Sequence, residues 1–281
     1  MGQPEFLFHY TSLETLALIL ENRTLCFNNL MNVDDVEEAE TADMGLFGKY
    51  VNVSCWTEEE SESIALWNLY TPNMHGVRIK LPLFPFKKYS YKKGQFFLTE
   101  DIETYINIEK IYHEDKGSIV ANQPQLVRVE YTDDASLLIP VVRTCTPPSA
   151  VQQYLQATNL RDIKDTHLSV KYAFDNLGKY KRTQWAFQKE WRYLITSSPM
   201  GVRESYPSTL QKQQEMIRRL ENKNQKAPYK QLFLELDSNA LKIMEVLLGP
   251  RMTTAEKILA KALLEKHGLS SQWKESGLRI R

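Results

Sequence analysis

Short runs of alternating apolar and polar residues, separated by capped helical segments, make up the first third of the chain. Because successive side chains of a strand point to opposite faces, such runs predict strands. Ser12 stands just before leucines and alanines at helical spacing, so a helix is expected to follow the first strand directly. A second helix is expected to carry Trp67 and Tyr70. The strands predicted here cover residues 6–8, 24–27, 51–56 and 76–81.

The remainder of the chain adds further strands and a helical middle. Thr253 and Glu256 have the spacing of a capping box, which predicts that a last helix begins there. Helices are also expected at residues 151–180 and 208–225, and strands at residues 126–131, 137–142, 185–195, 231–236 and 243–248.

Together these elements predict an α+β fold with a split, mostly antiparallel β core and flanking helices. No internal repeat or low-complexity linker divides the sequence. Residues 1–281 are therefore expected to form a single domain, with insertions near residues 84–125 and 205–228. An all-helical chain or a doubly wound parallel sheet would contradict this prediction.

The composition is that of an ordinary globular protein, with 42% hydrophobic and 25% charged residues. Lys plus Arg equals Asp plus Glu, 35 against 35, so no global field draws the protein to nucleic acid or to a membrane surface. No apolar run approaches the ~18 residues of a membrane helix, and the N-terminus lacks the features of a signal peptide. We therefore expect a cytoplasmic protein without a membrane partner.

The cysteines and histidines do not have the spacing of a metal site. Cys26, Cys55 and Cys145 are far apart and form no Cys-x-x-Cys pair, and the five histidines are scattered. Free thiols in a reducing compartment are expected. No metal is expected.

The predicted strand at residues 185–195 carries a candidate catalytic carboxylate. Its odd positions are almost all aromatic or apolar, whereas Glu190 and Arg192 share the opposite face with Gln188. A carboxylate on a rigid strand that faces a cleft suits catalysis. In the alternative interpretation, Glu190 and Arg192 only pair with each other at the surface.

Two other features also have both a functional and a structural interpretation. His9 lies where a strand ends and a helix begins, a position that exposes side chains to ligands. A histidine in this position is otherwise a core residue with one hydrogen bond. Trp67 and Tyr70, three positions apart on one helix, form either a ligand-stacking wall or part of the core.

Several segments, in this order, resemble a large bacterial family of uncharacterised domains, some of them linked to abortive infection and phage resistance. The similarity spans nearly the whole chain. It differs in the acidic loop at residues 34–38, where Val36 stands in place of the proline that the family usually has. The segments that carry the resemblance are residues 8–13, 32–38, 54–56, 66–70, 189–192, 247–250 and 275–281.

The chain also resembles the ADP-ribosyltransferases of the diphtheria-toxin and poly-ADP-ribose-polymerase class. These enzymes have a histidine on the first strand, an aromatic side chain that stacks on nicotinamide, and a glutamate on a late central strand. The resemblance implies NAD as substrate and a toxin or antiphage-defence effector. It implies Glu190 and His9 as catalytic residues, and His9, Tyr10, Thr11, Trp56, Trp67, Tyr70 and Arg192 as residues that bind NAD.

A basic and aromatic stretch is a candidate nucleic-acid site, because lysines neutralise phosphates and tyrosines stack on bases. Its residues are Lys87, Lys88, Tyr89, Tyr91, Lys92 and Lys93. The alternative is a solvated hairpin. Two other functions stay open: a nuclease with His9 as acid or base and Arg192 on phosphate, and a non-catalytic sensor or antitoxin.

Overall fold

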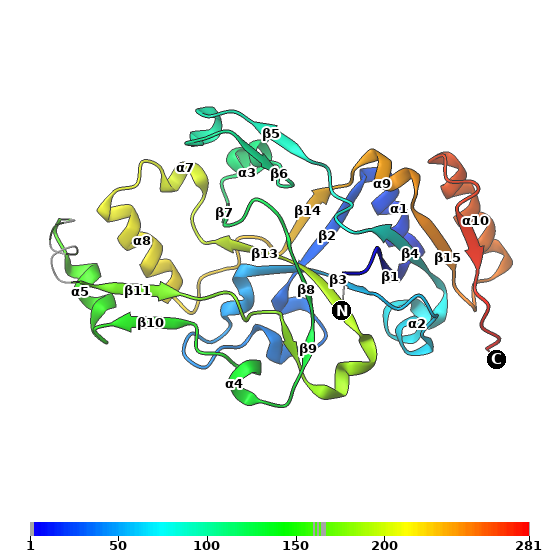
Figure 1. The fold of residues 1–281 in the computed structure, drawn as a ribbon, viewed down its shortest axis with the longest axis horizontal. Coiled ribbons are helices and arrows are strands. Elements are labelled where there is room, and N and C mark those ends of the chain that lie inside the picture. Colours follow the sequence, from blue (N-terminus) through cyan, green and yellow to red (C-terminus); the bar gives the residue numbers. More distant parts are fainter. Residues whose placement is uncertain (1–2, 160, 162, 164–166, 281) are drawn as a thin grey trace.

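The computed structural model has a mixed α+β fold in which helices flank a mostly antiparallel sheet (Figure 1). The structure describes residues 3–159, 161, 163 and 167–280. Within them the main sheet has the strand order β14-β2-β3-β1-β4-β15-β16, and β13, with β7 and β8, continues it from the other side of β3. The predicted α+β class and antiparallel core are confirmed.

The main sheet has antiparallel neighbours throughout, except that β15 and β16 are parallel. In sheet order its strands are β14 (Gln231–Glu235), β2 (Thr24–Asn29), β3 (Val51–Thr57), β1 (Phe6–Ser12), β4 (Gly76–Pro82), β15 (Glu245–Leu248) and β16 (Trp273–Glu275), with β13 (Glu190–Ser198), β7 (Ser118–Ile119) and β8 (Gln125–Arg128) beyond β3. The three small two-stranded sheets pair β5 (Tyr89–Tyr91) with β6 (Ile102–Thr104), β9 (Glu130–Tyr131) with β12 (Tyr180–Lys181), and β10 (Arg143–Thr146) with β11 (Ser169–Tyr172).

The helices begin at the capping residues that the sequence indicates. Ser12 accepts a hydrogen bond from the Thr15 backbone at 3.1 Å, and Thr253 forms the predicted capping box with Glu256. The helices are α1 (Leu13–Asn22), α2 (Ile64–Tyr70), α3 (Ile108–Glu114), α4 (Ala135–Leu138), α5 (Ala150–Gln156), α7 (Val202–Ser205), α8 (Leu210–Glu221), α9 (Ser238–Lys242) and α10 (Thr254–Lys266), with 3-10 turns η1 (Leu30–Asn32), η2 (Val36–Ala39), η3 (Phe47–Tyr50), η4 (Pro72–Met74), η5 (Gln95–Phe97) and η6 (Thr183–Gln188). None of the helices described is long and apolar enough to cross a membrane.

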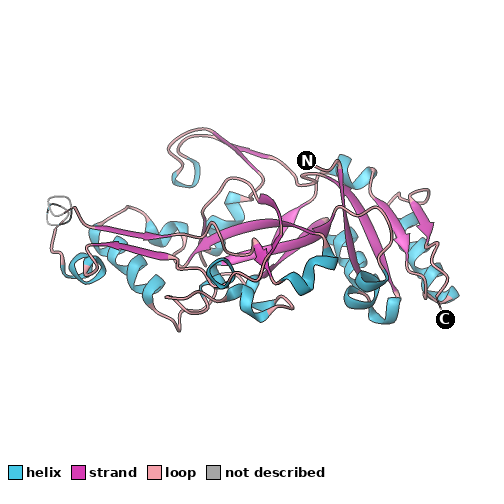
Figure 2. Ribbon diagram, turned by 60° about the horizontal axis from the view of Figure 1, so that its bottom comes forward, coloured by secondary structure: helices cyan, strands magenta, loops and turns pink. Residues whose placement is uncertain are grey.

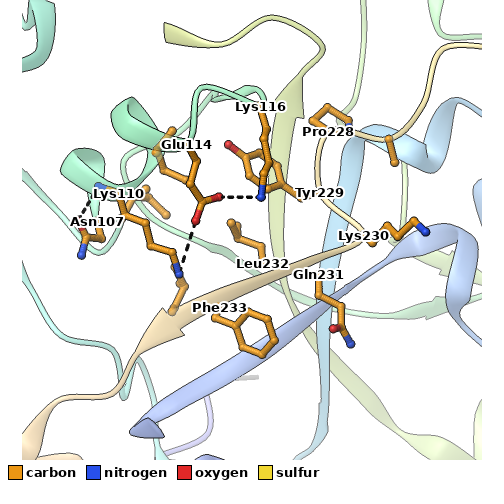
Figure 3. A pocket seen from close by; sticks show the side chains of 14 residues that line it. Asn107, Lys110, Glu114, Lys116, Pro228, Tyr229, Lys230, Gln231, Leu232 and Phe233 are labelled. Atoms are coloured by element: carbon orange, nitrogen blue, oxygen red, sulfur yellow. Dashed lines mark hydrogen bonds and ion pairs between the residues drawn. The ribbon is translucent and has the colours of Figure 1, made fainter. Parts of the chain in front are cut away.

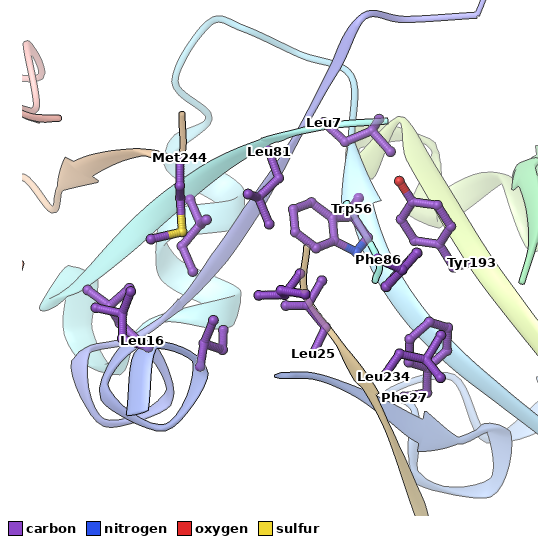
Figure 4. Close-up of a cluster of buried hydrophobic side chains, with 14 of the residues drawn as sticks. Leu7, Leu16, Leu25, Phe27, Trp56, Leu81, Phe86, Tyr193, Leu234 and Met244 are labelled. Carbon is purple, nitrogen blue, oxygen red and sulfur yellow. The ribbon is translucent and has the colours of Figure 1, made fainter. Parts of the chain in front are cut away.

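One large core holds the sheet and helices together. Figure 4 shows Trp56, Phe27 and Tyr193 in one cluster with Leu7 of β1, Leu16 of α1 and Leu81 of β4. Burial of such large apolar side chains contributes about 1.5–3 kcal/mol each. A second cluster, around Phe47 and Tyr50, lies beneath the arm made by β10, β11, α5 and α8, which extends from one end of the molecule in Figures 1 and 2. The core therefore makes the strands of the main sheet a rigid support.

Two predicted elements differ from the structure, and a third begins later than expected. Residues 137–142 do not form a strand, because α4 occupies the first part and Pro140 follows it. The predicted helix at residues 151–180 ends at Gln156, and β11 and β12 follow; residues 160, 162 and 164–166 of that prediction lie outside the described residues. Short β-branched stretches in the arm pair with each other there, so tertiary contacts override a weak helical pattern.

The predicted central strand begins five residues later than expected. Residues 185–188 belong to η6, and Lys189 takes a left-handed backbone conformation with φ of 43°. The strand begins at Glu190, where Tyr131 Oη accepts the backbone N–H at 2.8 Å. Alternation over so few residues does not distinguish a strand from a turn. The aromatic backing is correspondingly smaller, because Phe187 is exposed whereas Trp191 and Tyr193 are buried.

Candidate active site

The sheet divides at β3, and this division builds the site. On one side β3 pairs with β13 along its whole length, from Glu190 opposite Thr57 to Thr196 opposite Val51. On the other side β2 pairs only with the first part of β3, and β1 only with Thr57. The edge of β3 between these two pairings faces a gap, which we call the fork.

His9 lies in the fork, in the middle of β1 and not at the junction of strand and helix that the sequence indicated, because β1 continues to Ser12. Its Nδ1 is 2.8 Å from the carbonyl oxygen of Cys55, so Nδ1 carries the proton and donates it. Burial lowers the pKa of His9 below its usual value, although the bond to Cys55 opposes this effect. The imidazole is therefore neutral at pH 7. Nε2 bears a lone pair and has no hydrogen-bond partner among the described residues, so it is an acceptor for a ligand group.

Glu190 stands at the first position of β13, on the same face of the sheet as Arg192. It is 4% exposed, and its oxygens receive Arg192 Nε at 2.6 Å and Lys181 Nζ at 3.1 Å. Burial alone would raise the pKa of Glu190, but the charges of Arg192 and Lys181 outweigh it and lower the pKa to about 2. Glu190 is thus an ionised carboxylate at every physiological pH.

Arg192 is a structural residue. Its side chain is fully buried, and its five N–H groups all have acceptors: two carboxylates, those of Glu38 and Glu190, and the carbonyl of Gly178 at 3.0 Å. The guanidinium has no donor left for phosphate or NAD. The ligand-binding role predicted for Arg192 is therefore replaced by one in positioning Glu190. The predicted pairing of Glu190 with Arg192 exists, but in the interior instead of at the surface.

Two members of this buried cluster were missed by sequence reasoning. Glu38 comes from the acidic loop, and Lys181 from β12; both are almost fully buried. With Glu190 and Arg192 they form a cluster of two carboxylates and two cations, which we call the charge cluster. The sequence could have indicated Glu38, because it lies in the acidic loop within one of the segments that resemble the bacterial family. It could not have indicated Lys181, because a single lysine in a polar stretch is usually exposed to solvent.

Tyr70, at the end of α2, completes the site from the opposite wall. Its hydroxyl oxygen accepts a hydrogen bond from Gln188 Nε2 at 2.7 Å. Burial, followed by the negative charge of Glu190, raises the pKa of Tyr70 far above its usual value, so the phenol keeps its proton. The side chain is 36% exposed, which leaves the ring accessible.

Two adjoining pockets meet at these residues. The smaller, of about 60 Å³, is bounded by Phe8, Tyr10, Trp56, Leu66 and Gln188; the larger, of about 250 Å³, is bounded by the polar side chains Asn28, Asn32 and Asp34 and by Lys181. Both pockets are lined by His9, Cys55, Tyr70 and Glu190. They are two chambers of one site, which we call the fork cleft. The structure therefore brings His9, Tyr70 and Glu190 together, although 181 positions separate the first from the last.

The other predicted NAD-binding residues divide between wall and core. Trp56 lies behind His9, with ring centroids 5.0 Å apart, and Tyr10 lines the smaller chamber while its hydroxyl caps Ser63. Trp67 is fully buried against Tyr10 and does not line either chamber. Thr11 is also buried outside the chambers. The predicted ligand contacts of Trp67 and Thr11 are therefore wrong, since the core takes both side chains.

The basic stretch forms the expected hairpin, with Tyr89 and Tyr91 stacked on each other in β5. Its charges are largely compensated. Lys87 pairs with Glu235 at 2.7 Å, Lys88 with Glu103 at 2.5 Å and Lys92 with Asp101 at 2.8 Å; Lys93 has no ion-pair partner among the described residues. This arrangement favours the solvated hairpin over a phosphate-binding surface.

A hollow larger than either chamber of the fork cleft lies elsewhere, between α3 and β14. It has a volume of about 610 Å³, and Figure 3 shows Lys110, Glu114 and Lys116 on one wall and Gln231 and Phe233 on the other. Glu114 pairs with both lysines, at 4.0 and 3.4 Å. Size alone does not make this groove an active site. Its charged side chains Lys110, Glu114 and Lys116 are partly exposed, whereas the charged groups of the fork cleft are buried and converge on one another.

Among the residues described, no three His, Cys, Asp or Glu side chains are grouped to hold a metal ion. Burial raises the pKa of the Cys26 thiol to about 11, and that of Cys55 well above its usual value. Both cysteines are therefore thiols at pH 7 and poor nucleophiles. The chemistry available in the fork cleft is thus that of an ionised carboxylate, a neutral imidazole and a phenol.

Comparison of the chain with protein families, with curated proteins and with solved structures found no match. Membership of the bacterial family that the sequence resembles therefore stays a prediction.

Proposed function

We propose that the protein cleaves NAD at the bond between nicotinamide and ribose, as an ADP-ribosyltransferase or an NAD glycohydrolase. The observation that carries the proposal is the convergence of His9, Tyr70 and Glu190 on the fork cleft. They come from the first strand, from the helix after the middle strand, and from the late strand that pairs with it. This is the order that the resemblance to ADP-ribosyltransferases implies.

Each side chain suits one part of that reaction. The ring of Tyr70 offers a flat surface for nicotinamide, and Nε2 of His9 accepts a hydrogen bond from a ribose hydroxyl or an amide. Asn28, Asn32 and Asp34 line the larger chamber with further polar groups for sugar hydroxyls. Trp56 packs against His9 and also lines the smaller chamber.

Glu190 supplies the charge that the bond cleavage needs. As the bond from ribose C1′ to the nicotinamide nitrogen breaks, its electron pair goes to the ring, and positive charge develops on the ribose. A carboxylate held ionised nearby stabilises that charge. Water or an acceptor then bonds to C1′ and loses a proton to solvent. The products are nicotinamide and ADP-ribose, free or attached to the acceptor.

The charge cluster explains why this carboxylate stays fixed. Arg192 and Lys181 hold both oxygens of Glu190, while Glu38 and the carbonyl of Gly178 occupy the remaining donors of Arg192. Such preorganised groups do not have to reorient during the reaction. A role as toxin or antiphage-defence effector is part of the proposal and is supported by the sequence resemblance alone.

The test compares Glu190→Gln with Glu38→Gln. Both substitutions remove one carboxylate charge from the same Arg192, but only Glu190 lines the fork cleft. We expect both variants to lose similar stability, while only Glu190→Gln loses nicotinamide release, by about a hundredfold or more. The measurements are free nicotinamide by chromatography and the thermal midpoint.

Equal turnover in the two variants would assign Glu190 a purely structural role. If wild-type protein binds NAD without releasing nicotinamide, alone or with protein and nucleic-acid acceptors, it is a sensor. If it neither binds nor cleaves NAD, the proposal is wrong.

A further inference from the structure

Lys181 determines how the amide of Gln188 is oriented. The ammonium group of Lys181 has only donors, and its Nζ lies 2.8 Å from Gln188 Oε1. The amide oxygen therefore faces Lys181, and the NH₂ group faces away from it. Both residues are buried, at 2% exposure each, so water does not compete for these bonds. The usual ambiguity in the orientation of a glutamine amide is thus removed by its charged neighbour.

The orientation of Gln188 in turn determines the role of Tyr70. The NH₂ group of Gln188 donates to Tyr70 Oη at 2.7 Å, and an amide nitrogen cannot accept. The hydroxyl of Tyr70 is therefore the acceptor in this bond, and its own proton points elsewhere. No other hydrogen-bond partner of that hydroxyl is found in the described part of the chain. Since Tyr70 lines both chambers, the proton is available to a ligand in the fork cleft.

We propose that the hydrogen bonds from Lys181 to Gln188 and from Gln188 to Tyr70 orient the Tyr70 hydroxyl. In this orientation the hydroxyl donates a hydrogen bond to the ribose next to the scissile bond. The inference rests on the proposed function. Gln188 stands two residues before Glu190, and Lys181 bonds to both, so the hydroxyl end of Tyr70 is held on the Glu190 side of the site. A tyrosine stacked on nicotinamide presents its ring to the base and this end to the sugar.

Gln188 and Lys181 are positioning residues in this scheme, and Tyr70 both stacks and donates. The ligand class follows from the same geometry. The site is expected to bind a flat ring with a sugar oxygen beside it more tightly than the ring alone, because only the former accepts the hydrogen bond from Tyr70. NAD fits this description, whereas free nicotinamide offers only the ring.

Gln188→Glu tests the direction of the bond. Glutamate keeps the length of the side chain and its contact with Lys181, but a carboxylate accepts from Tyr70 where the amide donates. The Tyr70 hydroxyl then donates its proton to the new carboxylate and no longer to the ligand. We expect kcat/KM for NAD to fall about fivefold to tenfold, the effect of one lost hydrogen bond. Inhibition by free nicotinamide, which uses the ring surface alone, should be unchanged.

Two further variants complete the test. Tyr70→Phe keeps the ring and removes the hydroxyl, so it should match Gln188→Glu, and the double variant should be no worse than either. Gln188→Leu leaves the hydroxyl free to rotate and should be milder than Gln188→Glu. Gln184→Glu, exposed on the same turn, is the matched charge control.

The opposite ranking would show that Gln188 serves structure alone. In that case Gln188→Glu, which preserves both contacts, would be the milder change, and the effects of Gln188→Glu and Tyr70→Phe would add. Either result overturns the inference while leaving NAD cleavage intact. Wild-type protein that neither cleaves nor binds NAD overturns the proposed function and this inference with it.

Discussion

The fork cleft and the β5–β6 hairpin both contain charged and aromatic residues, but the charged side chains are buried in the fork cleft and exposed in the hairpin. In the fork cleft, Glu190, Arg192 and Lys181 are buried and bonded to one another, and their partners come from distant strands. In the hairpin, Lys88 and Lys92 are exposed and pair with acidic residues of the neighbouring strand and turn.

The difference shows when a charged side chain can contribute to stability, binding or catalysis. An exposed ion pair is screened by water and salt and does little for stability or binding. A buried charge is costly unless several partners hold it, and those partners then fix its position. Residue type alone therefore marks a candidate site, whereas burial and partners decide whether chemistry is available there.

The largest effect is expected when a partner is removed from the charge cluster. Arg192→Met leaves Glu38 and Glu190 buried with only Lys181 to compensate them, which should lower the free energy of unfolding by about 3–5 kcal/mol. Urea denaturation at pH 7 measures this. Lys92→Ala is the matched change in the hairpin and should leave the midpoint where it is. Equal shifts in the two variants would remove the contrast between the regions.

A smaller effect should follow from the pKa of His9. Because burial lowers that pKa in the folded state, the unfolded chain binds the proton first as pH falls. The stability that neutral His9 contributes is complete above its usual pKa of 6.5 and is lost as pH falls towards the folded value. The stability advantage of wild type over His9→Asn should therefore shrink between pH 7 and pH 5.

Activity should follow the same titration. Protonated Nε2 cannot accept a hydrogen bond, so KM for NAD should rise as pH falls through the pKa of His9 in the folded protein, which lies below 6.5, with a smaller change in kcat. Denaturation curves and initial rates over this range provide the two measurements. A stability advantage that does not vary with pH would mean that His9 is accessible to solvent.

The smallest effect is expected in the hairpin. Replacing Lys87, Lys88, Lys92 and Lys93 together by alanine should leave the denaturation midpoint and NAD cleavage nearly unchanged, because the ion pairs lost are exposed. Nucleic-acid binding, measured against salt concentration, is the sharper readout. If wild type binds with a steep salt dependence that the variant loses, the predicted nucleic-acid site exists despite the ion pairs.

Local patterns were sufficient for much of the fold. Ser12, the Thr253 capping box and the short apolar runs of β1, β3 and β4 indicate elements that a few neighbouring residues are sufficient to specify. The same kind of pattern was misleading at residues 151–180 and 185–188, because a short stretch does not reveal which contacts it will make. There, strand pairing within the arm and the hydrogen bond from the Glu190 N–H to the Tyr131 hydroxyl accompany the observed structure.

By itself, the sequence determined the α+β class, the positions of most strands, and several residues that line the fork cleft, among them His9, Tyr70 and Glu190. Tyr70 and Glu190 stand at the ends of α2 and β13, and residue type and position along an element are local properties. Only the tertiary structure decided that Trp67 belongs to the core and that every N–H donor of Arg192 has an acceptor within the protein. It alone brought Glu38 and Lys181 to the charge cluster around Glu190. Burial and ion pairing are properties of residues brought together from distant parts of the chain, and no local pattern records them.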